Sequence, residues 1–331
     1  MVNKGADNSM KYKVFAKSVS GSKYTLKGWE CQDSSGKLET DFIQGIAVAD
    51  GHGSGDCFRS EHGSKIAIEV AFKQILLYCD AENSDEDSEP TYFSETGIIN
   101  FKYAVWNEWR KVVKNHWNNY LVKENVLGET EERYKSVSEK YRARYTADDK
   151  EIVEKYLYVA YGTTLSFAVA TPSQVLAMQI GDGSCVILQR DGEFRKPVPS
   201  DEDNFLNVTS SLCEDDANLK IRHTVIERGN SSTAPIAIFL SSDGVDDCYP
   251  SYMNEKYLYR LYSVIIDNII KKGYADTEKE IEQSLLTGMT KRGSQDDISL
   301  AFFISDNIDY LEEAYKNIDE DYKTDIMVNC E

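Results

Sequence analysis

The sequence lacks the marks of a secreted, membrane-bound or nucleic-acid-binding protein. Its seven cysteines are odd in number and scattered, and none forms a C-x-x-C pair, which favours reduced thiols over disulfides or a zinc site. The N-terminal residues lack the apolar core of a signal peptide, and no apolar run approaches a membrane span. Basic residues number 37 against 56 acidic ones, and the resulting net charge of -19 repels phosphate backbones. We therefore expect a cytoplasmic protein with no membrane and no nucleic-acid partner.

Common catalytic motifs are also missing. The chain has no G-x-x-x-x-G-K-[ST], no H-E-x-x-H and no G-x-S-x-G, which argues against a P-loop, a zinc protease helix and a nucleophile elbow. It shows no internal repeat. With 331 residues, of which 41% are hydrophobic, it is long enough for one large domain or two small ones with a sizeable core.

The most informative stretch is an apolar run that ends in an aspartate and a glycine-rich segment. Residues 43–49 are typical of a short buried strand, and Asp50-Gly51-His52-Gly53-Ser54-Gly55 follows at once. A carboxylate at the end of such a strand is costly to bury without a cation, and the glycines let the backbone come close to one. Asp-Gly is also a common turn, so these residues alone leave a solvated loop open.

Short runs rich in β-branched and apolar residues predict strands at residues 12–20, 43–49, 162–170, 175–180, 185–189, 221–226, 235–240 and 298–304. Helical spacing of apolar residues predicts helices at 59–79, 98–121, 255–271 and 277–290, and a charged helical excursion at 129–156. The tryptophans of 98–121 favour a helix that packs on the domain over an aromatic binding cage. The strands between 162 and 189 indicate an antiparallel meander rather than a parallel fold, with a hairpin at Asp191-Gly192.

Local turn signals predict how two of the aspartates meet. Ser34-Ser35-Gly36 is expected to form a turn after Asp33. The strands at 12–20 and 43–49 follow each other closely, so we expect a hairpin or neighbouring positions in one sheet. Either arrangement would bring Asp33 near Asp50.

Aspartates recur at the ends of the predicted strands and in the turns beside them: Asp33, Asp50, Asp182, Asp243 and Asp296. If they converge, their repulsion would raise their pKa values unless a divalent cation neutralised them. Carboxylate oxygens suit Mg²⁺ and Mn²⁺ rather than zinc. Two such ions about 3.5–4 Å apart can share a bridging hydroxide and clamp a phosphoryl group. The spacing alone therefore indicates a metal-dependent phosphoester hydrolase.

These motifs resemble, in order, those of the metal-dependent serine/threonine protein phosphatases, the type 2C family. The resemblance extends over about residues 12–305, with a divergent bacterial branch suggested by Cys31-Gln32-Asp33-Ser34. The matching segments are Asp50-Gly51-His52-Gly53, Gly162-Thr163-Thr164, Gly181-Asp182-Gly183, Ser242-Asp243-Gly244-Val245-Asp246-Asp247 and Gly293-Ser294-Gln295-Asp296-Asp297.

The resemblance implies an α+β fold, a four-layer α-β-β-α sandwich of two antiparallel sheets flanked by helices. It implies one catalytic domain over residues 1–331. The span from Asp50 to Gly162 is longer than usual in the family, so we expect an enlarged helical insertion at about 80–155. An acidic helix is expected at 305–331.

The resemblance also implies a dinuclear Mn²⁺ or Mg²⁺ centre at one end of the sandwich. Asp50 would bridge both ions, and the carbonyl of Gly51 would complete the coordination of one. Asp243 and Asp296 would hold the first ion, and Asp33 would serve the second directly or through water.

Two further residues take roles by the same resemblance. Asp182 matches the aspartate that helps to hold a third, weaker ion in some relatives. His52 matches the histidine proposed as general acid for the leaving alkoxide, and an imidazole that titrates near neutrality suits that role.

The sequence departs from the family pattern beside this centre. Gln32 stands where the family often has a glutamate, and Asp297 replaces the usual asparagine. The phosphate-binding arginine of the first segment has no match, and Glu30 lies in its neighbourhood. Lys23 or Lys27 is a candidate substitute, although an ammonium lacks the bidentate geometry of a guanidinium.

Three functions stay open at this point. The first is hydrolysis of phosphoserine and phosphothreonine in proteins, with a phosphorylated protein as substrate and a cognate kinase as a candidate partner. The second is a regulatory or binding module that keeps the fold without turnover. The third is a phosphatase of small phosphorylated molecules. His62, His116 and His223 lack metal-ligand spacing and are interpreted as structural or surface residues.

Overall fold

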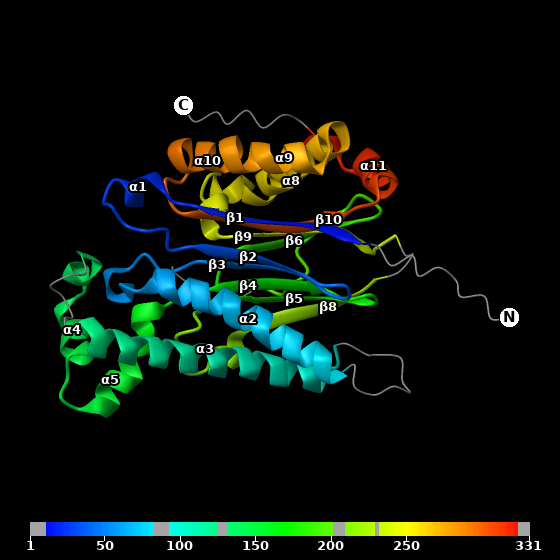
Figure 1. Cartoon of the computed structure of the whole chain (residues 1–331). Coiled ribbons are helices and arrows are strands. Elements are labelled where there is room, and N and C mark those ends of the chain that lie inside the picture. The colour runs from blue at the N-terminus through cyan, green and yellow to red at the C-terminus, as the bar shows by residue number, and fades with distance from the viewer. Residues whose placement is uncertain (1–10, 83–92, 125–131, 201–208, 229–231, 324–331) are drawn as a thin grey trace.

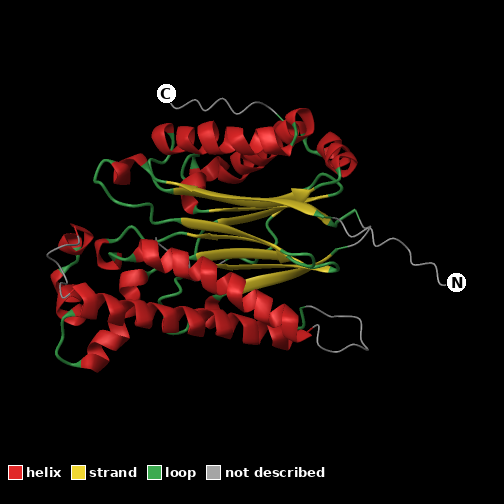
Figure 2. Ribbon diagram, in the orientation of Figure 1, coloured by secondary structure: helices red, strands yellow, loops and turns green. Residues whose placement is uncertain are grey.

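Two antiparallel sheets lie face to face, and helices cover the outer face of each (Figures 1 and 2). The computed structural model of the chain describes residues 11–82, 93–124, 132–200, 209–228 and 232–323. The α+β sandwich implied by the resemblance is confirmed.

Each sheet has five strands, and every pairing is antiparallel. The first sheet has the order β1–β10–β9–β6–β7, with strands at Tyr12–Val19, Ile298–Ser305, Pro235–Ser241, Ser184–Gln189 and Phe194–Arg195. The second has the order β2–β3–β4–β5–β8, with strands at Ser34–Glu39, Gln44–Ala49, Leu165–Ala170, Gln174–Ile180 and Arg222–Glu227.

Central strands are apolar throughout because they serve two cores at once. All residues of β9 are buried. Ile238 and Leu240 face the core between the two sheets, where they join residues such as Ile46. Phe239 points to the opposite side and stacks on Tyr262 of α8 (Asn254–Lys272), with the ring centroids 4.2 Å apart. Alternate side chains of one strand therefore fill different layers.

Helices α8 to α11 cover the first sheet, and α2 and α3 lie on the side of the second (Figure 1). After α8 come α9 and α10, joined by one π-helical turn at Ile281–Leu285. The 305–331 prediction corresponds to α11 and a 3-10 turn at Glu320–Tyr322, and residues 324–331 lie outside the described residues. The remaining bounds are Ser60–Glu82 for α2, Glu95–Glu124 for α3, Tyr274–Glu280 for α9, Leu286–Arg292 for α10 and Ile308–Asn317 for α11.

The segment between α2 and β4 adds helices to the second sheet. In α3, Trp109, Val113 and Trp117 are buried in the core beneath this sheet, so the tryptophans pack as predicted. After α3 come the turn η2 (Glu132–Ser136), α4 (Glu139–Tyr145), α5 (Lys150–Tyr156) and the turn η3 (Leu157–Tyr161). Over the described ranges, none of the helices is both long and apolar enough to cross a bilayer.

Three local predictions differ from the structure. Ser34-Ser35-Gly36 is not a turn but the start of β2, because its backbone pairs with β3. The predicted pairing of 12–20 with 43–49 is wrong, since β1 joins β10 in the other sheet. The meander also breaks after β5, because Gly181-Asp182-Gly183 leads the chain across to β6 in the first sheet. The hairpin at Asp191-Gly192 is confirmed by the pairing of β6 with β7.

Two glycines in helices allow the close packing of α2 to be tested, because one lies in a tight contact and the other does not. A Cβ at Gly63 in α2 would lie 1.9 Å from the carbonyl oxygen of Tyr161, whereas at Gly288 in α10 it would meet only the end of the Arg292 side chain at 3.1 Å. We expect Gly63→Ala to lower the free energy of unfolding by about 1–3 kcal/mol through overpacking. Gly288→Ala should raise it by about 0.5–1 kcal/mol through helix propensity.

Chemical denaturation of the two variants beside the unmodified chain measures both changes. Equal effects at the two positions would contradict the close packing of α2 on η3.

Candidate functional site

The five aspartates of interest meet because the strands are antiparallel. Asp33 precedes β2 and Asp50 follows β3, and the pairing of Ser34 with Ala49 places the two aspartates opposite each other. Asp182 lies in the turn between β5 and β6, while Asp243 follows β9 and Asp296 precedes β10. In antiparallel sheets the end of one strand and the start of its neighbour share an edge, so all five lie at one end of the sandwich.

A cavity of about 490 Å³ opens at this end. It is lined by nearly every residue that the sequence marks as functional, and Lys27 is the exception. The lining residues are Lys23, Tyr24, Asp33, Asp50, Gly51, His52, Gly53, Ser54, Cys57, Thr164, Asp182, Thr209, Asp243, Asp296 and Asp297.

The backbone of the glycine-rich loop is held by close contacts. A Cβ at Gly51 would lie 2.4 Å from the carbonyl oxygen of Gln32, so only glycine fits there. The Asp50 amide donates to Oγ1 of Thr164 at 3.0 Å, and the Thr164 amide donates to the Asp50 carbonyl at 2.9 Å. A Cβ at Gly162 would lie 2.6 Å from Cδ2 of His52, so this glycine leaves room for the imidazole. The Gly162-Thr163-Thr164 segment therefore packs directly against the glycine-rich loop and holds its backbone in place.

Burial and mutual repulsion raise the pKa values of the central carboxyl groups. The carboxyl group of Asp50 interacts with those of both Asp33 and Asp243. Burial, followed by the charges of Asp33 and Asp243, holds the pKa of Asp50 well above its usual range. The pKa of Asp33 rises to about 8, chiefly by burial, although a hydrogen bond from Ser242 opposes the rise. Without a counter-ion, these groups share protons.

The donor set fits a hard divalent cation. Oδ2 of Asp33 is buried and has no hydrogen-bond partner within the described part of the chain, an arrangement that costs free energy unless something binds there. Its neighbours Asp50 and Asp243 offer further carboxylate oxygens, which Mg²⁺ and Mn²⁺ accept. As the described side chains stand, however, no three His, Cys, Asp or Glu residues are gathered closely enough to hold an ion.

Asp296 is paired with a cation of the chain itself. The ammonium of Lys23 forms an ion pair with Oδ2 of Asp296, and this pair raises the pKa of Lys23 against the opposing effect of burial. Lys23 therefore neutralises a carboxylate that the resemblance assigns to the first ion. For Asp296 to bind an ion through this oxygen, the lysine would have to release it.

The two candidate phosphate-binding lysines lie in different surroundings. Lys23 lines the cavity, whereas Lys27 is exposed and its ammonium lies 4.6 Å from the ring centroid of Trp29. Glu30 is also exposed and pairs with Lys65 at 3.7 Å. The structure thus brings one of the two lysines to the aspartates.

His52 lines the cavity beside the carboxylates. Burial lowers its pKa, and the negative charges of Asp182 and Glu214 partly oppose this effect. An imidazole with a pKa below 6.5 is mainly neutral at pH 7, so its protonated form becomes more abundant as the pH falls.

The other histidines lie away from the cavity lining. His62 and His116 have ring centroids 4.6 Å apart, and Nδ1 of His116 lies 2.8 Å from the Tyr161 hydroxyl. His223 lies in β8 opposite Met178.

Sequence reasoning missed two residues that organise the site. Asp297 accepts hydrogen bonds from the amides of Gly21 and Gln32, both at 2.6 Å, and so ties the segments before and after α1 (Ser22–Thr25) to β10. Arg133 of η2 donates to the Gln32 side chain at 3.1 Å. The Asp297 position was visible as a departure from the family pattern, but no local signal marked Arg133.

Comparisons with known proteins concern the family and the fold of the chain. The family model described as protein phosphatase 2C matches residues 20–277. No curated protein matches the chain. A Caenorhabditis elegans sex determining protein of solved structure is 14% identical, with a TM-score of 0.51 over 92% of this chain and 67% of that one. The serine/threonine phosphatase Stp1 from Staphylococcus aureus is 13% identical, with a TM-score of 0.48 over 90% of this chain and 97% of that one. At these identities the first structure shows a likeness of fold alone.

The raised carboxyl pKa values predict how stability depends on pH in the metal-free protein. Because folded Asp33 keeps its proton up to about pH 8 while the unfolded residue loses it near pH 4, stability should fall as the pH rises between these values. The slope from this one group is at most about 1.4 kcal/mol per pH unit. Asp33→Asn cannot ionise there, so its slope should be flatter.

Denaturant titrations of both proteins in EDTA between pH 6.5 and 8 measure the difference. Equal slopes of stability against pH in the two proteins would contradict the prediction that folded Asp33 keeps its proton in this range.

Proposed function

Because this chain belongs to the protein phosphatase 2C family, we propose that it hydrolyses phosphoserine and phosphothreonine in proteins with the help of Mn²⁺ or Mg²⁺. The main support is the cavity at one end of the sandwich. Five aspartates from separate strand ends line it, and Asp33, Asp50 and Asp243 interact directly. Groups with such perturbed pKa values in a cleft mark a candidate active site.

In this proposal the ions would be held by the aspartates that line the cavity. Asp50 would serve both ions, and the carbonyl of Gly51 would complete the coordination of one of them. Asp243 and Asp296 would hold the first ion, and Asp33 would serve the second directly or through water. Asp182 would help to hold a third. Bound divalent ions activate water and offset the charge of a phosphoryl group.

The chain's own residues position the phosphate ester and move a proton. His52 lines the cavity, so its protonated form is placed to donate to the leaving alkoxide of serine or threonine. Lys23 is the cation that the described lining offers to a phosphate, as a point charge. We assign Lys27 no direct contact with the cavity, because it lies on Trp29.

A binding module without turnover is the second candidate function. It is favoured by the pairing of Lys23 with Asp296, which occupies a carboxylate that the first ion would need. A phosphatase of small phosphorylated molecules would use the same groups, and a substrate panel separates it from a protein phosphatase.

The proposed substrate is a phosphorylated protein, and a cognate serine/threonine kinase is the proposed partner. The net charge of -19 disfavours nucleic acid. The cytoplasmic location stays a prediction from the cysteines, and the six within the described residues are free thiols.

Loss of the central carboxylate should abolish turnover. We expect Asp50→Asn to lower kcat/KM for a phosphopeptide by more than about 100-fold, because it removes the carboxylate that interacts with both Asp33 and Asp243. EDTA should have a similar effect on the unmodified chain, and Mn²⁺ should restore activity. Asp246→Asn is a matched control, since this aspartate accepts from Ser184 at 2.9 Å and does not line the cavity.

Phosphate release with and without EDTA gives the rates. Activity that survives both EDTA and Asp50→Asn would exclude the metal mechanism. Binding of Mn²⁺ without turnover of any phosphopeptide would favour the binding module.

Proton donation by His52 can be tested by comparing two substrates whose leaving groups differ in their need for a proton. Serine leaves as a poor alkoxide that needs a proton, whereas para-nitrophenolate does not. His52→Gln should therefore lower kcat for a phosphoserine peptide by about 10²–10⁴-fold and change that for para-nitrophenyl phosphate far less. His116→Gln serves as control, because His116 contacts Tyr161 and not the cavity.

Steady-state rates for both substrates, measured between pH 5.5 and 8, check this assignment. Equal losses on the two substrates would refute proton donation by His52.

A further inference from the structure

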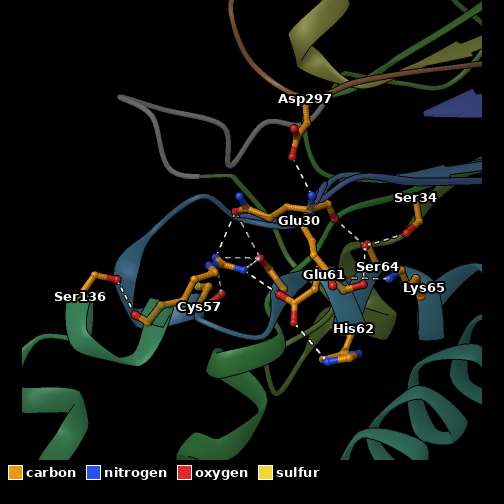
Figure 3. A network of polar contacts seen from close by, with 12 residues as sticks. Glu30, Ser34, Cys57, Glu61, His62, Ser64, Lys65, Ser136 and Asp297 are labelled. Carbon is orange, nitrogen blue, oxygen red and sulfur yellow. Dashed lines mark hydrogen bonds and ion pairs between the residues drawn. The ribbon is translucent and has the colours of Figure 1, made fainter. Parts of the chain in front are cut away.

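A buried arginine from the helical insertion lies where three segments of the site meet. Arg133 is 8% exposed, and its guanidinium donates to Oε2 of Glu61 at 2.7 Å. It also donates to Oε1 of Gln32 at 3.1 Å and to the carbonyl of Cys57 at 3.0 Å. Both terminal nitrogens reach Oγ of Ser60, at 3.2 and 3.3 Å. Figure 3 shows Cys57 and Glu61 on either side of this network.

Each partner belongs to a segment that carries or supports a central aspartate. Gln32 directly precedes Asp33. Cys57 ends the loop that begins at Asp50, and it lines the cavity. Ser60 starts α2. One cation with several directed donors therefore holds the Asp33 segment, the Asp50 loop and α2 together.

Gln32 is fixed on three sides. Its amide donates to Asp297 at 2.6 Å, and its carbonyl accepts from Oγ of Ser64 at 2.6 Å. Arg133 holds its side chain. The residues that surround this backbone, Ser64 and Asp297, are visible in Figure 3. A residue held in this way leaves Asp33 little freedom to turn away from the cavity.

The insertion supports the glycine-rich loop at further points. The amide of Ser138 donates to Oδ1 of Asp56 at 2.8 Å, and the Tyr145 hydroxyl donates to the Asp56 carbonyl at 2.8 Å. A Cβ at Gly55 would lie 2.4 Å from the carbonyl oxygen of Ser136. Residues 133–145 thus pack against the glycine-rich loop and form hydrogen bonds with it.

We propose that Arg133 is a positioning residue that sets the metal affinity of the candidate centre through Gln32 and the Asp50 loop. Arg133 does not line the cavity, so it is not a substitute for the missing phosphate-binding arginine. Its charge is balanced by Glu61, whose side chain is also buried, and this pairing makes burial of the guanidinium possible. The inference rests on the proposed function, since it concerns the same ions.

Calorimetric titration of the full chain with Mn²⁺ tests the proposal without turnover. Arg133→Met keeps much of the side-chain volume but removes the donors, and we expect it to weaken Mn²⁺ binding about 10–100-fold, as loss of groups that orient metal ligands does. Arg133→Lys keeps the charge and should recover part of the affinity. Arg110→Met is the control: Arg110 is a partly buried arginine of α3 that pairs with Asp215 at 3.1 Å and packs on the rings of Trp106 and Tyr158, none of which belongs to the Asp50 loop.

Gln32→Met provides a second test in case the Arg133→Met protein does not fold. It removes only the Oε1 acceptor, because Nε2 of Gln32 has no hydrogen-bond partner among the described residues. We expect a several-fold loss of Mn²⁺ affinity with an almost unchanged Tm. A supporting result is a loss of affinity in Arg133→Met and Gln32→Met that Arg110→Met does not share.

Two results would overturn the proposal. Unchanged Mn²⁺ affinity in a folded Arg133→Met protein, or in Gln32→Met when Arg133→Met does not fold, would show a purely structural role and leave the proposed function standing. Failure of the unmodified chain to bind either Mn²⁺ or Mg²⁺ would overturn the proposed function and this inference with it.

Discussion

Repulsion among buried carboxylates is the constraint on which the rest of this structure depends. Asp33, Asp50 and Asp243 lie together at the end of the sandwich, and their charges cannot all persist there without compensation. Protons compensate them in the metal-free state, and the ammonium of Lys23 compensates Asp296. A divalent cation would offset the same repulsion more fully, and this is the physical basis of the proposed metal site.

The two sheets make this cluster possible. Every pairing is antiparallel, so ends and starts of neighbouring strands coincide at one edge. Core packing between the sheets then fixes the distance between Asp50 of the second sheet and Asp243 after β9 of the first. Glycines at 51 and 162 allow the backbone contacts and the space for His52 that larger residues would exclude. The site is therefore a product of the whole sandwich rather than of any single loop.

The departures from the family pattern concentrate in the first segment. Glu30 faces solvent with Lys65, and no arginine lines the described cavity. The same segment receives a guanidinium from elsewhere, because Arg133 of η2 donates to the side chain of Gln32. Asp297, which directly precedes β10, accepts from the amide of Gln32 and supports the same backbone.

The sequence by itself determined the strands that end in aspartates, the helical spacing of Trp109, Val113 and Trp117, and the aspartates and His52 that line the cavity, because these depend on local pattern and on motifs in order. It did not reveal β2, since Ser34-Ser35-Gly36 has turn composition and becomes a strand only by pairing with β3. The assignment of β1 and β6 to the first sheet, the separation of Lys23 from Lys27, and the reach of Arg133 to Gln32 were decided by tertiary structure. All of these depend on contacts between residues far apart in the chain, which no local window contains.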